Sequence, residues 1–139
     1  MARIIYNNII PFPGFQAITI LPFVFARKKF KPLLEKTINH EGIHLRQQSE
    51  CLVTLLAIMF PLCAVFISLW WLLTAPFAYF VWYGIEYVIR LCIYGNQKEA
   101  YRNISFEQEA FLKERDFNYF EDRKSFAWFK YITKKTYRR

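Results

Sequence analysis

The longest uncharged segment of the chain runs from Cys51 to Ile85 and contains no Asp, Glu, Lys, Arg or His. It holds 35 residues of a 139-residue chain, which has room for one domain and one hydrophobic core. A domain of this size cannot cover so many uncharged residues on all sides. As one helix the segment would be about 52 Å long, whereas a bilayer core is about 30 Å thick and is crossed by about 20 residues. The segment therefore predicts a hairpin of two membrane spans, residues 51–73 and 77–94, with a turn at Thr74-Ala75-Pro76.

The basic residues lie on both sides of this uncharged segment. Seven precede it and twelve follow it, and the net charge is +8. Both flanks of a hairpin emerge on one side of the membrane, so the positive-inside rule predicts a multi-pass protein of the cell (inner) membrane with both termini in the cytoplasm. The lipid bilayer is then an expected partner, and membership of a larger membrane complex stays open. Nucleic acid is not an expected partner, because the basic residues flank apolar sequence and no recognised nucleic-acid motif is present.

The polar flanks carry signals of strands before the hairpin and of helices around it. Residues 3–10 and 16–26 are rich in β-branched and aromatic residues and predict two short strands joined by a turn. Apolar residues at helical spacing predict a helix over residues 32–60, polar in its first half and apolar in its second. The predicted fold is thus mainly α, with a transmembrane helical hairpin, a short N-terminal β-hairpin and a zincin-like helix. We expect one membrane-embedded domain over residues 1–139, divided into a β-rich part (1–31), a motif helix (32–50), the membrane hairpin (51–94) and a C-terminal helical part (95–139).

Two further elements are expected in the C-terminal part. Ser105 is followed three residues later by Gln108, which is the pattern of a capping box and predicts a helix over residues 106–120. The segment Ser125–Tyr137 is aromatic and basic. It suits a helix at the membrane interface, and a tail packed on the domain is the alternative.

Both histidines of the chain lie in one motif, His40-Glu41-Gly42-Ile43-His44. Residues four apart lie about one turn apart on one face of a helix, so the two imidazoles can hold one Zn²⁺ ion. Glu41 lies between them and can take a proton from a zinc-bound water and return it to a leaving amine. The motif therefore predicts His40 and His44 as zinc ligands and Glu41 as the catalytic base.

A hydrolytic zinc site needs a third protein ligand and one open position. Glu50 lies too far along a continuing helix, and Glu86 would have to reach from within the hairpin. Glu107 and Glu109 return to the starting side after the hairpin, but they are about 200° apart on a helix and cannot both face the metal. Both stay open as the third ligand. The candidate hydrogen-bond donors to an oxyanion are Tyr101 and Arg102.

The order of HExxH, two-span hairpin and ExxA resembles the membrane zinc peptidases of the CAAX-prenyl and heat-shock type, within the gluzincin group. Their downstream motif is ExxAD, so the resemblance implies that Glu107 is the third ligand and that Ala110 is the Ala. Phe111 stands where the family has an Asp that commonly orients a histidine ligand, and Glu109 or Asp116 could take that role. The longer pattern HExIHxxQQxE followed by FExEA is similar to that of small bacterial membrane proteins. It adds to the surroundings of the site Gln47, Gln48 and Glu50.

Two functions follow from these patterns. The first is a membrane metalloprotease, a zinc-dependent hydrolase that cleaves a peptide or protein substrate through a zinc-activated water. The second is a non-catalytic zinc-binding membrane protein, in which the metal joins two segments as part of a structural or assembly subunit. A catalytic site keeps one ligand position open, whereas a structural site is closed by four protein ligands.

Overall fold

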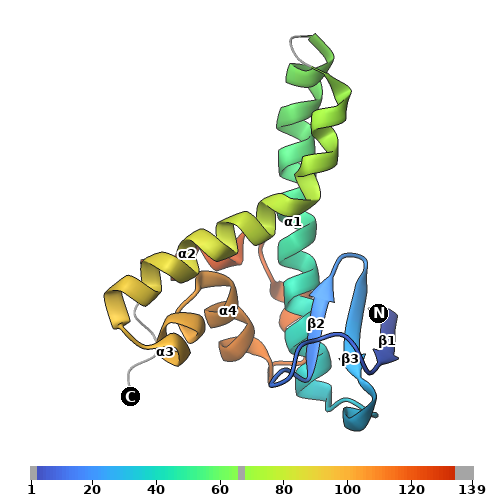
Figure 1. The fold of residues 1–139 in the computed structure, drawn as a ribbon, viewed down its shortest axis with the longest axis vertical. Coiled ribbons are helices and arrows are strands. Elements are labelled where there is room, and N and C mark those ends of the chain that lie inside the picture. The colour runs from blue at the N-terminus through green and yellow to red at the C-terminus, as the bar shows by residue number, and fades with distance from the viewer. Residues whose placement is uncertain (1–2, 66–67, 134–139) are drawn as a thin grey trace.

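The computed structural model describes residues 3–65 and 68–133. The protein is mainly helical, with a three-stranded sheet near its N-terminus and two long apolar helical segments (Figure 1). The strands are β1 (Arg3–Asn7), β2 (Ala17–Ile20) and β3 (Phe23–Arg27), and the 3-10 segments are η1 (Lys28–Phe30), η2 (Leu69–Phe77) and η3 (Ala127–Tyr131). The α-helices are α1 (Glu35–Val65), α2 (Ala78–Tyr94), α3 (Gln97–Arg102), α4 (Ser105–Lys113) and α5 (Tyr119–Asp122).

The sheet has the order β1-β3-β2 and differs from the predicted two-stranded hairpin. The predicted strand over residues 16–26 is two antiparallel strands, because the chain turns at Leu21-Pro22, and Pro22 has no N–H to continue a ladder. β1 pairs with β3 in parallel instead of forming a hairpin with the strand that follows it. It ends at Asn7, whose side chain accepts hydrogen bonds from the backbone N–H groups of Ile9 and Ile10. β2 is left as an edge strand beside the first half of α1.

The predicted helix over residues 32–60 is found as α1, which begins at Glu35 and continues through Pro61 to Val65. The predicted turn at Thr74-Ala75-Pro76 is wrong, because this tripeptide lies inside η2, which leads directly into α2. Pro76 lies just before α2, where a missing N–H costs little. The second apolar segment begins next to Ser68, whose hydroxyl accepts from the N–H of Trp70.

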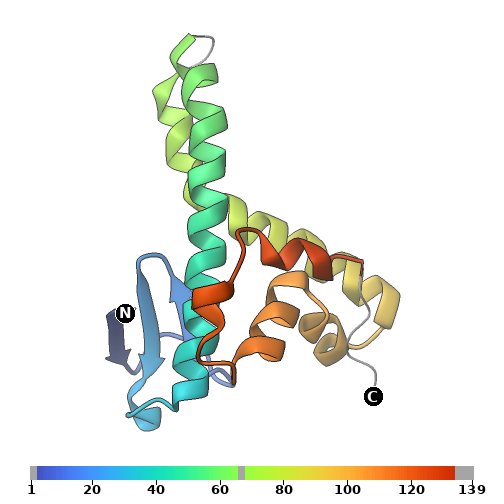
Figure 2. The ribbon, with the colours of Figure 1, turned by 180° about the vertical axis from the view of Figure 1, so that it is seen from behind.

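The second half of α1 and η2 lie side by side and project from the rest of the molecule (Figures 1 and 2). Both long segments, Glu35–Val65 and Leu69–Tyr94, are long and apolar enough to cross a membrane. The outer face of α2 is apolar as well, with exposed side chains at Val81, Ile85, Val88, Ile89 and Ile93. Its inner face buries the ion pair of Glu86 and Arg90. α2 therefore turns its apolar face outward and its charged groups inward.

The C-terminal part packs under α2 around Tyr79, Ile104, Phe106 and Trp128. α4 ends at Lys113, so the predicted helix over residues 106–120 is shorter than expected and is followed by a turn and by α5. The predicted capping box is wrong: Ser105 is the first helical residue, and its hydroxyl donates to Glu86 of α2.

The expected interfacial helix over Ser125–Tyr137 is, where the structure describes it, the short segment η3. Trp128 and Tyr131 of η3 are buried, so this segment packs on the domain below α2 (Figure 2). Residues 134–137 of that prediction lie outside the described residues.

Candidate metal centre

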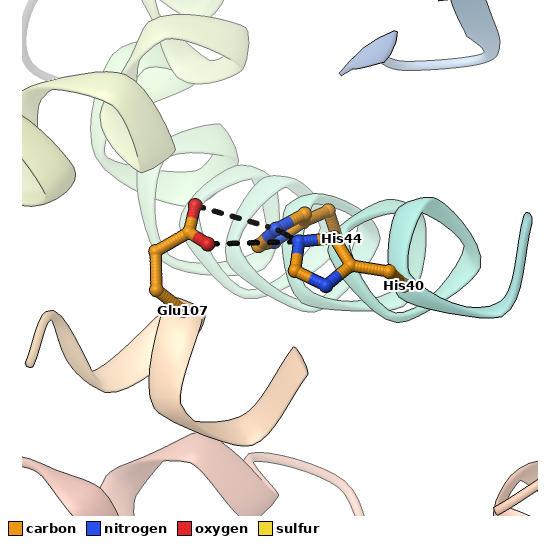
Figure 3. A group of neighbouring side chains, drawn as sticks. All are labelled: His40, His44 and Glu107. Atoms are coloured by element: carbon orange, nitrogen blue, oxygen red, sulfur yellow. Dashed lines mark hydrogen bonds and ion pairs between the residues drawn. The ribbon is translucent and has the colours of Figure 1, made fainter. Parts of the chain in front are cut away.

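Three side chains from two helices converge in the angle between α1 and α2. His40 and His44 come from the polar half of α1, and Glu107 comes from the first turns of α4 (Figure 3). Their possible ligand atoms lie within 4.8 Å of one another. The two Nε2 atoms are 3.1 Å apart, and the Glu107 oxygens lie 3.6 Å from His40 Nε2 and 3.4 Å from His44 Nε2. All three side chains are almost fully buried.

The far side of the His40 ring is fixed by a carboxylate. His40 Nδ1 lies 3.2 Å from Oε2 of Glu114, the residue that follows α4. A carboxylate can only accept here, so Nδ1 carries the hydrogen and donates it. Phe111, which stands where the resembling family has an Asp, instead packs its ring against His40 at 4.8 Å.

The far side of the His44 ring is fixed by an amide. His44 Nδ1 lies 2.8 Å from Oε1 of Gln47, and Gln47 Nε2 faces two acceptors, the carbonyl of Phe106 and the carboxylate of Glu109, each at 3.1 Å. The amide nitrogen must face these acceptors, so its oxygen faces His44, and His44 Nδ1 donates to it. The hydroxyl of Tyr79 lies beside this contact, 3.2 Å from His44 Nδ1.

Because both Nδ1 atoms donate elsewhere, both Nε2 atoms of the neutral rings present lone pairs to each other. Two lone pairs 3.1 Å apart beside a carboxylate need a cation between them, either a proton or a metal ion. Donors bound at about 2.0–2.2 Å to a tetrahedral Zn²⁺ lie roughly 3.3–3.5 Å apart, close to the separations here. Glu107 Oε1 accepts from the Tyr83 hydroxyl at 2.9 Å, whereas its buried Oε2 accepts no hydrogen bond from the described residues. The residues therefore fit a metal ion.

The charges around the centre favour a cation. Burial lowers the pKa of His40, but the carboxylates of Glu107 and Glu114 outweigh it and raise that pKa to about 9. The pKa of His44 is also raised, because Glu107 outweighs the opposing effect of burial. Burial would raise the pKa of Glu107, but the two histidines hold it well below its usual range. The centre therefore keeps its carboxylate ionised at neutral pH and attracts positive charge.

Glu41 flanks the three converging side chains without joining them. Its carboxylate accepts a hydrogen bond of 2.7 Å from the hydroxyl of Thr19 on the edge strand β2. His40 and Glu41 line two adjoining cavities of about 650 and 750 Å³. The first is mostly apolar and aromatic, and Tyr79, Tyr83 and Glu107 also line it. Glu41 can thus reach a molecule bound in either cavity.

The other predicted residues lie around the centre. Glu109 faces away from the histidines, so of the two open candidates only Glu107 meets them. Glu50 is paired with Arg123, Glu86 with Arg90, and Asp116 with Lys113. Tyr101 and Arg102 both line the second cavity, and the Arg102 guanidinium lies 5.4 Å from the centre of the Phe111 ring.

Four contributors were not assigned these roles from the sequence. Glu114 lies seven residues after Glu107, which is two turns along the same helix face, and Gln47 lies three residues after His44. These spacings could have pointed to both. Tyr79 and Tyr83 lie within the second predicted span, and their hydroxyls face the centre. Their spacing of four on one helix face was the available signal.

No protein-family model, curated protein or solved structure matches this chain.

Proposed function

We propose that this protein is a membrane-embedded, zinc-dependent peptidase. The observation that carries the proposal is the convergence of two Nε2 lone pairs and the Glu107 carboxylate on one point, with Glu41 beside it. Two histidines and one glutamate are a ligand set of catalytic zinc sites, and they leave a position for water. No fourth His, Cys, Asp or Glu joins this group among residues 3–65 and 68–133. An open site of this kind favours hydrolysis over a purely structural role.

Each residue of the site has a separate role in the proposed peptide hydrolysis. His40, His44 and Glu107 would hold the zinc ion, which when bound supplies the charge that lowers the pKa of water to about 7. Glu41 takes the proton of the attacking water and passes it to the leaving amine. Thr19 donates to Glu41 and keeps its carboxylate directed into the cavities. The Gln48 amide occupies the Thr19 carbonyl and the Leu21 N–H, so an extended peptide substrate would pair with the edge of β2 around Ala17. Tyr101 and Arg102 are the candidate donors to the oxyanion.

The membrane location rests on where the apolar side chains of the two long segments lie: they are exposed on the outside of the protein, and the charged groups are buried inside. An exposed apolar face on α2 above a buried ion pair is the arrangement expected in lipid, where ionisable groups face protein. The second half of α1 and η2 project beyond the domain and expose large apolar side chains. We place these segments in the bilayer of the cell membrane and the basic flanks, with the metal centre, on the cytoplasmic side.

The test of the proposal is removal and return of the metal. Protein purified in mild detergent is expected to contain about one zinc ion per chain and to cleave unstructured peptides. A chelator abolishes cleavage, and zinc restores it. His40→Ala is expected to lose both metal and cleavage, because one ligand is missing. Elemental analysis and a peptide digest read by mass spectrometry measure the two quantities.

The outcomes separate the two functions that the sequence suggested. Zinc without cleavage of any peptide would support the non-catalytic, structural role. Absence of zinc from the wild-type protein after gentle purification would contradict both roles.

Zinc affinity is expected to rise with pH. Below its pKa of about 9 His40 holds a proton in the metal-free protein, and zinc must displace it. The apparent affinity should rise about tenfold per pH unit from about pH 6 and level off above about pH 9. The metal-free protein has the opposite dependence: the raised pKa stabilises it below the ordinary pKa of about 6.5, and this contribution is lost as the pH rises through about 9.

Chelator-competition titrations at several pH values measure the affinity, and thermal unfolding of the metal-free protein measures the stability. A zinc affinity that is flat over this range would contradict the assignment of His40.

A further inference from the structure

Gln47 is fully buried and makes a hydrogen bond with each polar atom of its side chain. Its oxygen accepts from His44 Nδ1 at 2.8 Å, and its nitrogen donates to the carbonyl of Phe106 and to Glu109 Oε2. A flipped amide would place its N–H group against His44 and its oxygen against two acceptors, so only one orientation satisfies all partners. Gln47 therefore sets which nitrogen of His44 carries the hydrogen.

Glu109 is held from the other side by the segment that contains α5. The Tyr119 hydroxyl donates to Glu109 Oε1 at 2.9 Å, and Arg123 Nε donates to the same atom at 2.6 Å. Arg123 also binds Glu50, on the same helix as the histidines. The fully buried Glu109 carboxylate thus has donors on both sides. We call this set of residues the supporting network: Gln47, Glu50, Glu109, Tyr119 and Arg123.

We propose that Gln47 and Glu109 are positioning residues of the metal centre, which fix the tautomer and ring orientation of His44 so that its Nε2 lone pair faces the metal. The inference rests on the proposed zinc site. It assigns a role to the acidic residue that the sequence offered as an alternative ligand: Glu109 acts on the metal through Gln47 and His44. A partner on the far nitrogen of a histidine ligand also makes that ligand more basic.

The neighbouring Gln48 provides a matched comparison. It is also a buried glutamine of α1, but its amide donates to the Thr19 carbonyl and accepts from the Leu21 N–H. Gln48 therefore docks β2 on α1, and its hydrogen-bond partners are backbone groups of β2 and of the residue after it, not a histidine. The two side chains have the same chemistry and similar burial and differ in what they orient.

The test compares zinc affinity in single and paired variants. Gln47→Leu removes the acceptor and is expected to weaken zinc binding about 10–100-fold, whereas Gln48→Leu should change it by less than about threefold. Gln47→Glu alone places a second carboxylate against Glu109 and should also weaken binding. The double variant Gln47→Glu with Glu109→Gln exchanges amide and carboxylate. Its carboxylate at position 47 again accepts from His44, and its amide at position 109 donates to that carboxylate. The Phe106 carbonyl loses its donor, so zinc affinity should be about tenfold higher than in Gln47→Glu alone without reaching the wild-type value.

Chelator-competition titrations give the affinities, and thermal unfolding in detergent gives the stability of each variant. If Gln47→Leu binds zinc no more weakly than Gln48→Leu, or if the double variant is no better than Gln47→Glu, the positioning role is overturned. If Gln47→Leu does not fold, the comparison of Gln47→Glu with the double variant decides. A wild-type protein without zinc overturns the proposed function together with this inference, whereas zinc that depends on His40 but not on Gln47 overturns this inference alone.

Discussion

Glu41→Gln is expected to lower peptide cleavage about 10²–10⁴-fold while about one zinc ion per chain stays bound. The amide is close in shape to the carboxylate and can still accept from the Thr19 hydroxyl, so the local structure should persist. It cannot take a proton from water at neutral pH, so the substitution removes the proposed base while His40, His44 and Glu107 remain to hold the metal. Initial rates of peptide cleavage and the zinc content of the same preparation measure the two expected results.

Glu35→Gln is the matched control for this experiment. Glu35 lies on the same helix in an exposed position of the first turn, outside both cavities. Its variant should retain wild-type cleavage and zinc. Cleavage by Glu41→Gln at more than half of the wild-type rate would exclude Glu41 as the base. Loss of zinc in Glu41→Gln would instead show that this carboxylate helps to hold the metal.

The residues of the candidate site could be predicted from the sequence because the helix face on which each side chain lies depends on local geometry. Four-residue spacing on a helix places His40 and His44 on one face wherever the helix lies. Glu107 and Glu109 point in different directions for the same reason, so one of them had to face away. What the spacing could not give was the direction of α4 relative to α1. The resemblance to a known peptidase pattern favoured Glu107, and in the structure it is Glu107 that lies beside the histidines.

The parts that could not be predicted depend on contacts between distant segments. The second apolar segment already begins at Leu69, so Pro76 lies within it, just before α2, and the sequence alone does not distinguish a proline that precedes a helix from a proline in a loop. The pairing of β1 with β3 accompanies a core formed by Val24, Ala26 and Leu33, against which Ile4 and Tyr6 of β1 pack, and does not depend on a turn between neighbouring strands. The carboxylate partner of His40 is Glu114, and neither of the substitutes considered for the missing Asp takes that place.

Glu86→Ala is expected to lower the free energy of unfolding by about 3–5 kcal/mol, because it leaves Arg90 buried without its counter-charge. Glu86 Oε1 accepts from the Arg90 guanidinium at 3.0 Å and from the Ser105 N–H at 2.9 Å, and Oε2 accepts from the Ser105 hydroxyl at 2.6 Å. The same carboxylate therefore supplies the cap at the start of α4. Since Glu107 lies in the first turn of that helix, zinc affinity should fall as well.

Two further variants accompany Glu86→Ala: a control at an exposed carboxylate, and a double variant that distinguishes loss of the ion pair from loss of the cap. Glu121→Ala removes an exposed carboxylate and should change the free energy of unfolding by no more than about 0.5 kcal/mol. Glu86→Leu combined with Arg90→Met removes both buried charges and should cost less than Glu86→Ala alone, yet it still leaves α4 without its cap. Denaturant unfolding in detergent, followed by tryptophan fluorescence, gives the stabilities, and chelator competition gives zinc affinity. If the double variant regains stability but not zinc affinity, the cap on α4 is what places Glu107. If it regains both, the damage in Glu86→Ala comes from the unpaired arginine, and α4 is held in place by its packing against η3.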